Sequence, residues 1–226
     1  MKSKNARTSG NIRSILVIGA GRFGNNLAIN LANLGNEVMV IDINEDAINA
    51  IAPYVTKVQI GDCLDINGLR QLGVHNFDIC FVCISQNFQA SMEITAMLKE
   101  LGAQCVVSKT DRDIHADLLR RIGADDVVYP EKDMARRTAM KYSALGAFDY
   151  IQLSSEYAIM EILVPKSWVG CALKDLGVRA RHNVNIIGNK ENGAINPIIS
   201  AEHVFQQDEH LIVAGEHKNI INMINQ

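Results

Sequence analysis

Residues Ser14 to Asp42 read SILVIGAGRFGNNLAINLANLGNEVMVID, and this stretch decides the fold. The apolar run Ile15–Ile18 predicts a buried strand, and the residues after the glycine-rich turn predict a helix to about Leu34. Glu37–Ile41 predicts a second strand. Together they form a strand–helix–strand unit that carries the pattern Gly-x-Gly-x-x-Gly at its first turn, which is typical of dinucleotide-binding folds.

Each part of this turn has a physical role in binding a nucleotide. Gly19 permits the tight turn, Gly21 lets a phosphate approach the backbone, and Gly24 lets helix and strand pack closely. The helix start offers unpaired N–H groups and a partial positive charge to a phosphate. Asp42 follows the second strand, where a carboxylate can accept the ribose hydroxyls. It disfavours a 2′-phosphate, but it does not distinguish NAD from ATP or ADP.

The alternation of strands and helices continues to residue 130. Strands are predicted at Lys57–Ile60, Phe77–Ile84, Gln104–Val107 and Asp126–Tyr129, and helices at Asp46–Ala52, Asp65–Leu72, Phe88–Leu101 and Ile114–Ile122. Such alternation predicts an α/β, Rossmann-like, doubly wound parallel sheet.

After Pro130 the pattern changes, which predicts a second, small α/β lobe. A helix is expected over Glu131–Gly146. It is followed by strands within Ile151–Val164, at Asn183–Ile187 and at Leu211–Ala214, helices at Ala172–Leu176 and Lys218–Ile224, and a hairpin turn at Asn192-Gly193. The predicted organisation is a flexible tail over 1–12, a nucleotide-binding domain over 13–130, a connecting helix over 131–148 and a second domain over 149–226.

Composition limits the classes of function. The net charge is −3 and no basic block follows the first residues, so no nucleic-acid partner is expected. Neither an apolar run of about 20 residues nor a signal peptide is recognisable. The five cysteines are unlike a disulfide framework, and Cys80 and Cys83 lie three apart in a predicted strand, so they point to opposite faces. We therefore expect core cysteines in a reducing, cytoplasmic compartment.

The residues that follow the strands define a candidate site, because parallel-sheet proteins bind ligands at the carboxyl ends of their strands. Arg22 and Lys109 could neutralise phosphates, while Asp42 and Asp62 could hold the ribose and adenine edges. Each residue alone could equally be a solvated loop side chain. The other strand ends contribute Ser85, Gln86, Asn87, Ser108 and Tyr129 to Glu131.

The segments GAGRFG, VIDIN, GDCLD, ISQNFQAS and GADDVVYPEKDMARR occur in this order. On these segments the chain resembles the KtrA/TrkA family of regulatory subunits of bacterial potassium uptake systems, which are built from RCK (regulator of potassium conductance) N-terminal and C-terminal domains. A single copy of each domain resembles the KtrA type. The resemblance implies nucleotide contacts at Gly19, Gly21, Arg22, Phe23, Gly24, Asp42, Ile43, Asp62, Cys63, Ser85, Asn87, Gln89 and Lys109.

The resemblance also implies ligands and partners. The nucleotide would be ATP/ADP or NAD/NADH, with Arg22 reaching the terminal phosphates of a neighbouring subunit's nucleotide and Glu131 binding Mg²⁺, Ca²⁺ or Na⁺. Dimers would assemble into an octameric ring on the cytoplasmic face of a membrane potassium channel or transporter (KtrB/TrkH-like). In some relatives the C-terminal domain binds cyclic di-AMP, which here implicates Arg179, Asn185, Ile186, Ile187 and Pro197. Arg179 or Arg181 could equally be a surface charge.

Two alternatives share the nucleotide-binding half. An NAD-dependent oxidoreductase would need a proton-transfer group and a substrate domain, and His182, His203, His210 and His217 lack metal-ligand spacing. A redox-sensing repressor would need a winged helix with a basic recognition helix. Neither pattern is recognisable in the sequence, so we expect a sensor rather than an enzyme, in which nucleotide binding shifts a conformational equilibrium.

Overall fold

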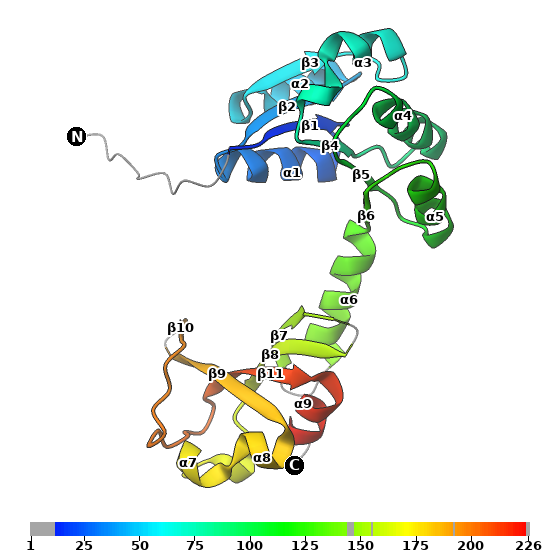
Figure 1. Cartoon of the computed structure of the whole chain (residues 1–226). Helices are drawn as coiled ribbons and strands as arrows, with labels where there is room; N and C mark the ends of the chain where they lie inside the picture. The colour runs from blue at the N-terminus through cyan, green and yellow to red at the C-terminus, as the bar shows by residue number, and fades with distance from the viewer. Residues whose placement is uncertain (1–11, 144–146, 155, 192, 225–226) are drawn as a thin grey trace, which may run out of the picture. The chain divides into compact units, whose positions relative to one another are not determined.

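The computed structural model describes residues 12–143, 147–154, 156–191 and 193–224. They divide into two compact units, the first ending at Lys132 and the second beginning at Asp133 (Figure 1). The predicted tail therefore lies almost wholly outside the described residues, as does Asn192 of the predicted hairpin turn.

The first unit is a six-stranded parallel sheet in the order β3-β2-β1-β4-β5-β6, with helices on both faces (Figure 1). Its strands are β1 (Ser14–Ile18), β2 (Glu37–Asp42), β3 (Lys57–Ile60), β4 (Ile79–Val82), β5 (Val106–Lys109) and β6 (Asp126–Val128). Its helices are α1 (Arg22–Asn33), α2 (Glu45–Ile51), α3 (Ile66–Leu72), α4 (Phe88–Glu100) and α5 (Asp113–Arg121), with 3₁₀ turns at Ala52–Tyr54 and Val74–Asn76. The strand order reverses between β1 and β4, which is where doubly wound sheets bind ligands. The predicted fold class is confirmed.

The two faces of this sheet carry separate apolar cores. Residues of α1 and α2 pack with one face, and Cys83 lies in that core. Residues of α3 and α4 pack with the other face, where Cys80 is fully buried. The opposite orientation predicted for the two cysteines is confirmed. Burial is the largest cause that raises the pKa of each thiol to about 12, so neither is poised for thiolate chemistry.

Strand β5 lies two residues beyond its predicted position, and this changes the candidate site. The predicted strand was Gln104–Val107, but α4 ends at Glu100 and is followed by a turn in which the Ala103 amide donates to Leu98 O, so the strand begins only at Val106. The strand therefore includes Ser108 and Lys109, and both are buried. The sequence placed these two residues directly after the strand, whereas in the structure they are its last two residues.

The second unit holds a five-stranded antiparallel sheet in the order β10-β9-β11-β8-β7. The strands are β7 (Ala147–Gln152), β8 (Tyr157–Leu163), β9 (Val184–Glu191), β10 (Ala194–Asn196) and β11 (His210–Glu216). The helices are α7 (Leu173–Leu176), α8 (Val178–His182) and α9 (His217–Ile224), with a 3₁₀ turn at Lys166–Trp168. The strand pair predicted to begin at Ile151 begins at Ala147, β9 runs four residues past its predicted end, and α8 was not predicted.

Helix α6 (Pro130–Ser143) begins in the first unit and continues into the second (Figure 1). Its start agrees with the predicted connecting helix, which was expected to reach Gly146; residues 144–146 lie outside the described residues. In the described part of the chain, no helix combines the length and the apolar character that a bilayer-spanning helix needs.

Candidate nucleotide-binding site

Two glycines of the turn after β1 are required by the fold of the backbone, independently of any ligand. Gly19 has φ +99°, and its amide donates to Ile41 O at 2.8 Å. A Cβ added to Gly24 would lie 1.9 Å from the Gly19 carbonyl oxygen, which no side chain can tolerate without a backbone shift. These contacts fix the shape of the turn and the approach of α1 to the sheet.

Gly21 differs from these two residues. A Cβ added there would meet no other atom within 4 Å, and its backbone (φ −63°, ψ 179°) is open to any residue. Gly21 is also the N-cap of α1, and no side chain caps this helix. The twelve-residue helix therefore presents its first N–H groups, with their partial positive charge, beneath open space.

Asp42 connects the end of β2 to this glycine loop. Its Oδ2 accepts from the Ala20 amide at 2.6 Å and its Oδ1 from the Asn44 amide at 2.8 Å. A carboxylate has about four acceptor positions, so these two bonds leave capacity for a ribose hydroxyl. Asn44 in turn caps α2 by accepting from the Ala47 amide. The predicted ligand contact is thus held rigidly by backbone donors.

Lys109 is the centre of a polar cluster at the same edge of the sheet. Its side chain is only 6% exposed, and its Nζ donates to Ser85 Oγ at 2.8 Å and to Glu131 Oε1 at 2.7 Å. The same nitrogen lies 5.6 Å from the ring centroid of Phe23, in the first turn of α1. One buried cation is therefore surrounded by the ends of β4 and β5 and by the starts of α1 and α6.

Glu131 is held as a carboxylate by this cluster. The hydrogen bond from Lys109 is the largest cause that lowers its pKa, burial opposes it, and the charge of Arg22 lowers it further. Among the described residues there is no group of three or more His, Cys, Asp or Glu side chains that could hold a metal ion. Within one chain Glu131 is thus a lone carboxylate whose counter-ion is an ammonium.

Some residues predicted to contact the nucleotide use their side chains in bonds to the nearby backbone. Asp62 Oδ1 accepts from the Leu64 amide, and Asn87 caps α4 by accepting from the Ala90 amide. Cys63 is buried, and this burial, followed by the charges of Asp62 and Asp42, raises the pKa of its thiol to about 12. The Cys63 thiol is therefore not poised for thiolate chemistry.

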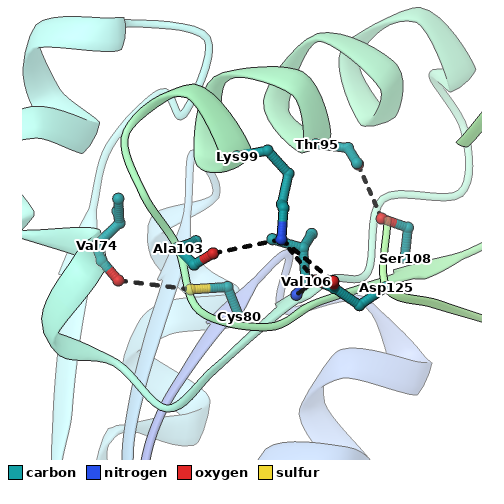
Figure 2. Close-up of polar contacts among 8 residues, drawn as sticks. All are labelled: Val74, Cys80, Thr95, Lys99, Ala103, Val106, Ser108 and Asp125. Atoms are coloured by element: carbon teal, nitrogen blue, oxygen red, sulfur yellow. Dashed lines mark hydrogen bonds and ion pairs between the residues drawn. The ribbon is translucent and has the colours of Figure 1, made fainter. Parts of the chain in front are cut away.

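Other predicted residues lie at the edge of this site or outside it. The Ile43 side chain is 72% exposed, and Gln89 donates to Glu93 within α4. Ser108 is fully buried and shares a hydrogen bond with Thr95, so its hydroxyl faces α4 (Figure 2). The feature that sequence reasoning missed is the Lys109–Glu131 pair, although a lysine that ends the buried run VVSK is an available signal.

In the second unit, the residues proposed for cyclic di-AMP do not share one face. Ile186 packs against the core of the unit, whereas its neighbours Asn185 and Ile187 on β9 are exposed. Arg179 on α8 and Pro197 after β10 are also exposed.

A sequence model of the TrkA-N domain matches residues 15–130. The chain belongs to this family. It is 38% identical to Ktr system potassium uptake protein C of Bacillus subtilis (strain 168), over 92% of this chain and 94% of that protein. It is 36% identical to Ktr system potassium uptake protein A of the same organism, over 95% and 96% of the two chains.

Solved structures agree with the fold of this TrkA-N family member. The GsuK RCK domain matches with a TM-score of 0.68 at 20% identity, covering 100% of this chain and 51% of that one. The chain thus spans about half of that chain's length. The GsuK channel bound to NAD matches with a TM-score of 0.67 at 21% identity, over 96% of this chain and 39% of that chain. At this identity the likeness establishes the fold alone.

Proposed function

We propose that this chain is a nucleotide-sensing regulatory subunit of a potassium uptake system. The observation that carries the proposal is the glycine loop, where Gly19 and Gly24 are fixed by packing while Gly21 faces open space over an uncapped helix start. The alignment with Ktr potassium uptake proteins over nine-tenths or more of both chains supports the potassium-transport role.

The ligand at this loop is an adenosine nucleotide, ATP/ADP or NAD/NADH. Structures of GsuK bound to NAD and to ADP support both classes. Asp42 takes the ribose hydroxyls, the start of α1 takes a phosphate, and Arg22 reaches the terminal phosphates of a neighbouring subunit's nucleotide. A cation (Mg²⁺, Ca²⁺ or Na⁺) at Glu131 would need phosphate oxygens or a second subunit to complete its ligands, because hard cations take six or more oxygens.

Calorimetry with ATP, ADP, NAD and NADH on the full chain tests nucleotide sensing. We expect saturable binding of at least one of the four and a rise in Tm with that ligand, because a ligand that binds the folded state stabilises it. Arg22→Ala is expected to weaken ATP more than ADP. Equal losses would contradict the contact to a terminal phosphate, and no binding of any of the four would contradict the proposal.

The proposed organisation assigns residues 13–130 to nucleotide binding, 131–148 to a connecting helix and 149–226 to a second ligand-sensing domain. Cyclic di-AMP is a candidate ligand of this second domain, at Arg179, Asn185, Ile186, Ile187 and Pro197. Dimers assemble into an octameric ring that docks on the inner face of the membrane through a potassium channel or transporter. Light scattering checks the assembly, and a monomer at all concentrations would refute it.

We further propose that the chain is a sensor without catalytic activity. Incubation with NADH and a panel of carbonyl substrates tests this proposal. NADH oxidation that depends on substrate and is abolished by one substitution in the cleft would overturn it in favour of an oxidoreductase.

A further inference from the structure

A cavity of about 440 Å³ lies at the amino ends of the parallel strands. Its lining includes Ser14, Glu37 and Lys57, which are the first residues of β1, β2 and β3. The glycine loop and the candidate nucleotide site lie at the opposite, carboxyl ends of the strands. Ligand pockets in proteins commonly measure about 300–1,000 Å³, so this cavity has room for a small molecule.

The pairing of β2 with β3 brings two opposite charges to the rim of this cavity. Lys57 pairs with Met39, and Glu37 precedes Met39 by two positions on β2, so the three side chains lie on one face of the sheet. Strand spacing puts the Cα atoms of Glu37 and Lys57 on the order of 8 Å apart. In the described part of the chain, neither of these two exposed side chains forms a hydrogen bond or an ion pair. A carboxylate and an ammonium are thus both available to a ligand.

The floor of the cavity is apolar. Met39 is buried in the core that α3 and α4 cover, and Leu72 of α3 and Phe77 pack against that core. Leu72 and Phe77 stay partly exposed where they line the cavity. Gln59 and Gln71 add two amide groups to the lining. Apolar surface with a few polar groups is the usual composition of a site for a small molecule.

Gly68 of α3 leaves this space open. It lies within the helix, where glycine is less favourable than alanine. Its φ is not in the left-handed region, and an added Cβ would lie 3.5 Å from its nearest neighbour, Asp65 Oδ2, which is ordinary van der Waals contact. Unlike Gly24, Gly68 is therefore not required by the backbone. A longer side chain at this position would enter the cavity, because Gly68 is part of its wall.

We propose that this cavity binds a small zwitterion with an apolar body, which is the chemistry of a free apolar amino acid. Glu37 takes the ammonium group, Lys57 takes the carboxylate, and the apolar body lies on Met39, Leu72 and Phe77. A simple anion or cation would meet one like charge on the rim, whereas a zwitterion meets two opposite ones. The proposal adds a second ligand site and does not depend on nucleotide binding.

Saturation-transfer NMR of the full chain with L-phenylalanine measures this binding. Phenylethylamine and phenylpropionate are matched probes, because each keeps the ring and only one of the two charges. We expect saturable binding of phenylalanine with a Kd on the order of 1 mM or below, which a ligand of this size can reach. Both single-charge probes should bind more weakly.

Substitutions at the two charges should give a crossed pattern. Glu37→Gln is expected to weaken phenylalanine and phenylethylamine roughly three- to ten-fold, because one charge-assisted hydrogen bond is lost, but not to weaken phenylpropionate. Lys57→Met is expected to weaken phenylalanine and phenylpropionate but not phenylethylamine. Binding to the apolar floor alone would not produce this pattern, so equal effects of Glu37→Gln on both single-charge probes would overturn the proposal.

A substitution in the cavity wall tests the location. Gly68→Leu is expected to abolish phenylalanine binding, since its side chain fills the cavity. Asn67→Leu puts the same side chain on the adjacent residue of α3, which is exposed and does not line the cavity, so it should keep the wild-type affinity. Gly68→Ala should keep or raise the Tm, because its Cβ fits and alanine favours helix. Wild-type affinity in a folded Gly68→Leu protein would contradict the proposed location.

Competition with ADP separates this site from the nucleotide site. A smaller hollow of about 180 Å³ shares Gly68 and Leu72 with the cavity and reaches Asp62, one of the residues predicted to contact the nucleotide. We expect phenylalanine to bind equally well with and without saturating ADP, and mutual exclusion would overturn the proposal. It would also fail if the wild-type protein bound none of phenylalanine, leucine and methionine. Failure to bind any nucleotide would contradict the proposed function alone.

Discussion

The two ends of the parallel sheet each carry a lysine–carboxylate pair, and they differ in what the pair connects. At one end, Lys99 of α4 bonds Asp125, which also accepts from the Val106 amide at 2.7 Å, while Lys99 lies near Ala103 O (Figure 2). All partners belong to α4, to β5 and to the turns that precede β5 and β6. This network fastens neighbouring elements of one domain to each other.

At the carboxyl end, Lys109 instead joins the sheet to α6, which leaves the domain. Here the lysine is buried and its partner is mostly exposed, and the start of α1 next to it lacks a side-chain cap. The same residue pairing thus connects different parts of the chain at the two ends. The Lys99–Asp125 pair joins elements within the domain, whereas the Lys109–Glu131 pair joins the domain to the helix that leaves it.

The largest loss of stability is expected at Gly24, which has a structural role in the glycine loop at the carboxyl end of the sheet. Gly24→Ala should destabilise the protein by about 3 kcal/mol or more, because its Cβ would meet the Gly19 carbonyl oxygen and the backbone must move. Urea unfolding measures the loss. Gly21→Ala is the control, with an expected loss of about 1 kcal/mol or less, because alanine is a poorer N-cap than glycine but its Cβ meets no atom within 4 Å. Equal losses in the two variants would show that the whole loop is structural.

Asp125→Ala tests the opposite end. It should cost about 2 kcal/mol, since the buried Val106 amide loses its acceptor and Lys99 its partner. Nucleotide affinity should not change, because these groups lie away from the glycine loop. Asp117→Ala on the surface of α5 is the control. A changed nucleotide affinity in Asp125→Ala would contradict the view that only the carboxyl end of the sheet takes part in nucleotide binding.

Acid pH should weaken the same network. Burial would raise the pKa of Asp125, but hydrogen bonds from Lys99 and the Val106 amide hold it below its ordinary value. A lowered folded-state pKa stabilises the protein above the ordinary pKa, and this contribution is lost as pH falls through the folded value. Between roughly pH 5 and 3, unfolding free energy should therefore fall less steeply in Asp125→Asn than in wild type. Identical slopes would contradict this assignment.

The smallest effect is expected at the exposed pair on α6. Lys132→Met removes the bond to Asp113, whose pKa this bond lowers. Because both side chains are more than half exposed, the unfolding free energy should change by less than about 0.5 kcal/mol. If Lys132→Met lost as much unfolding free energy as Asp125→Ala, the exposure of an ion pair would not indicate how much the pair stabilises this protein.

The sequence predicted the strand–helix alternation and the glycine loop because both depend on local pattern. Asn44, a residue type favoured at helix starts, lies directly before α2, and its side chain accepts from the Ala47 amide. The bounds of β5 could not be predicted, because VVSK allows the strand to end at either Val107 or Lys109. The length of the turn after α4 decides between them. The Lys109–Glu131 pair joins residues 22 positions apart, and only the folded sheet brings them together.

The second unit was harder to predict for a related reason. Its strands are antiparallel, and where each strand ends depends on which strands pair with it. Strand β9 extends to Glu191 because β10 and β11 pair with its last residues. Helix α8 has five residues and follows α7 after a single glycine with φ +55°. Such a short helix has too few residues to show the 3.6-residue spacing of apolar side chains by which a helix is predicted.

The central claim, that the start of α1 binds a nucleotide phosphate, is tested most directly by calorimetry of ADP binding to Gly21→Val. A Cβ added at Gly21 meets no protein atom within 4 Å, so the variant should fold, with only the small loss of stability expected from a poorer N-cap residue. It should lose ADP affinity by roughly ten-fold or more, because the side chain occupies the space above the helix start. Wild-type affinity in a folded Gly21→Val protein would contradict the claim.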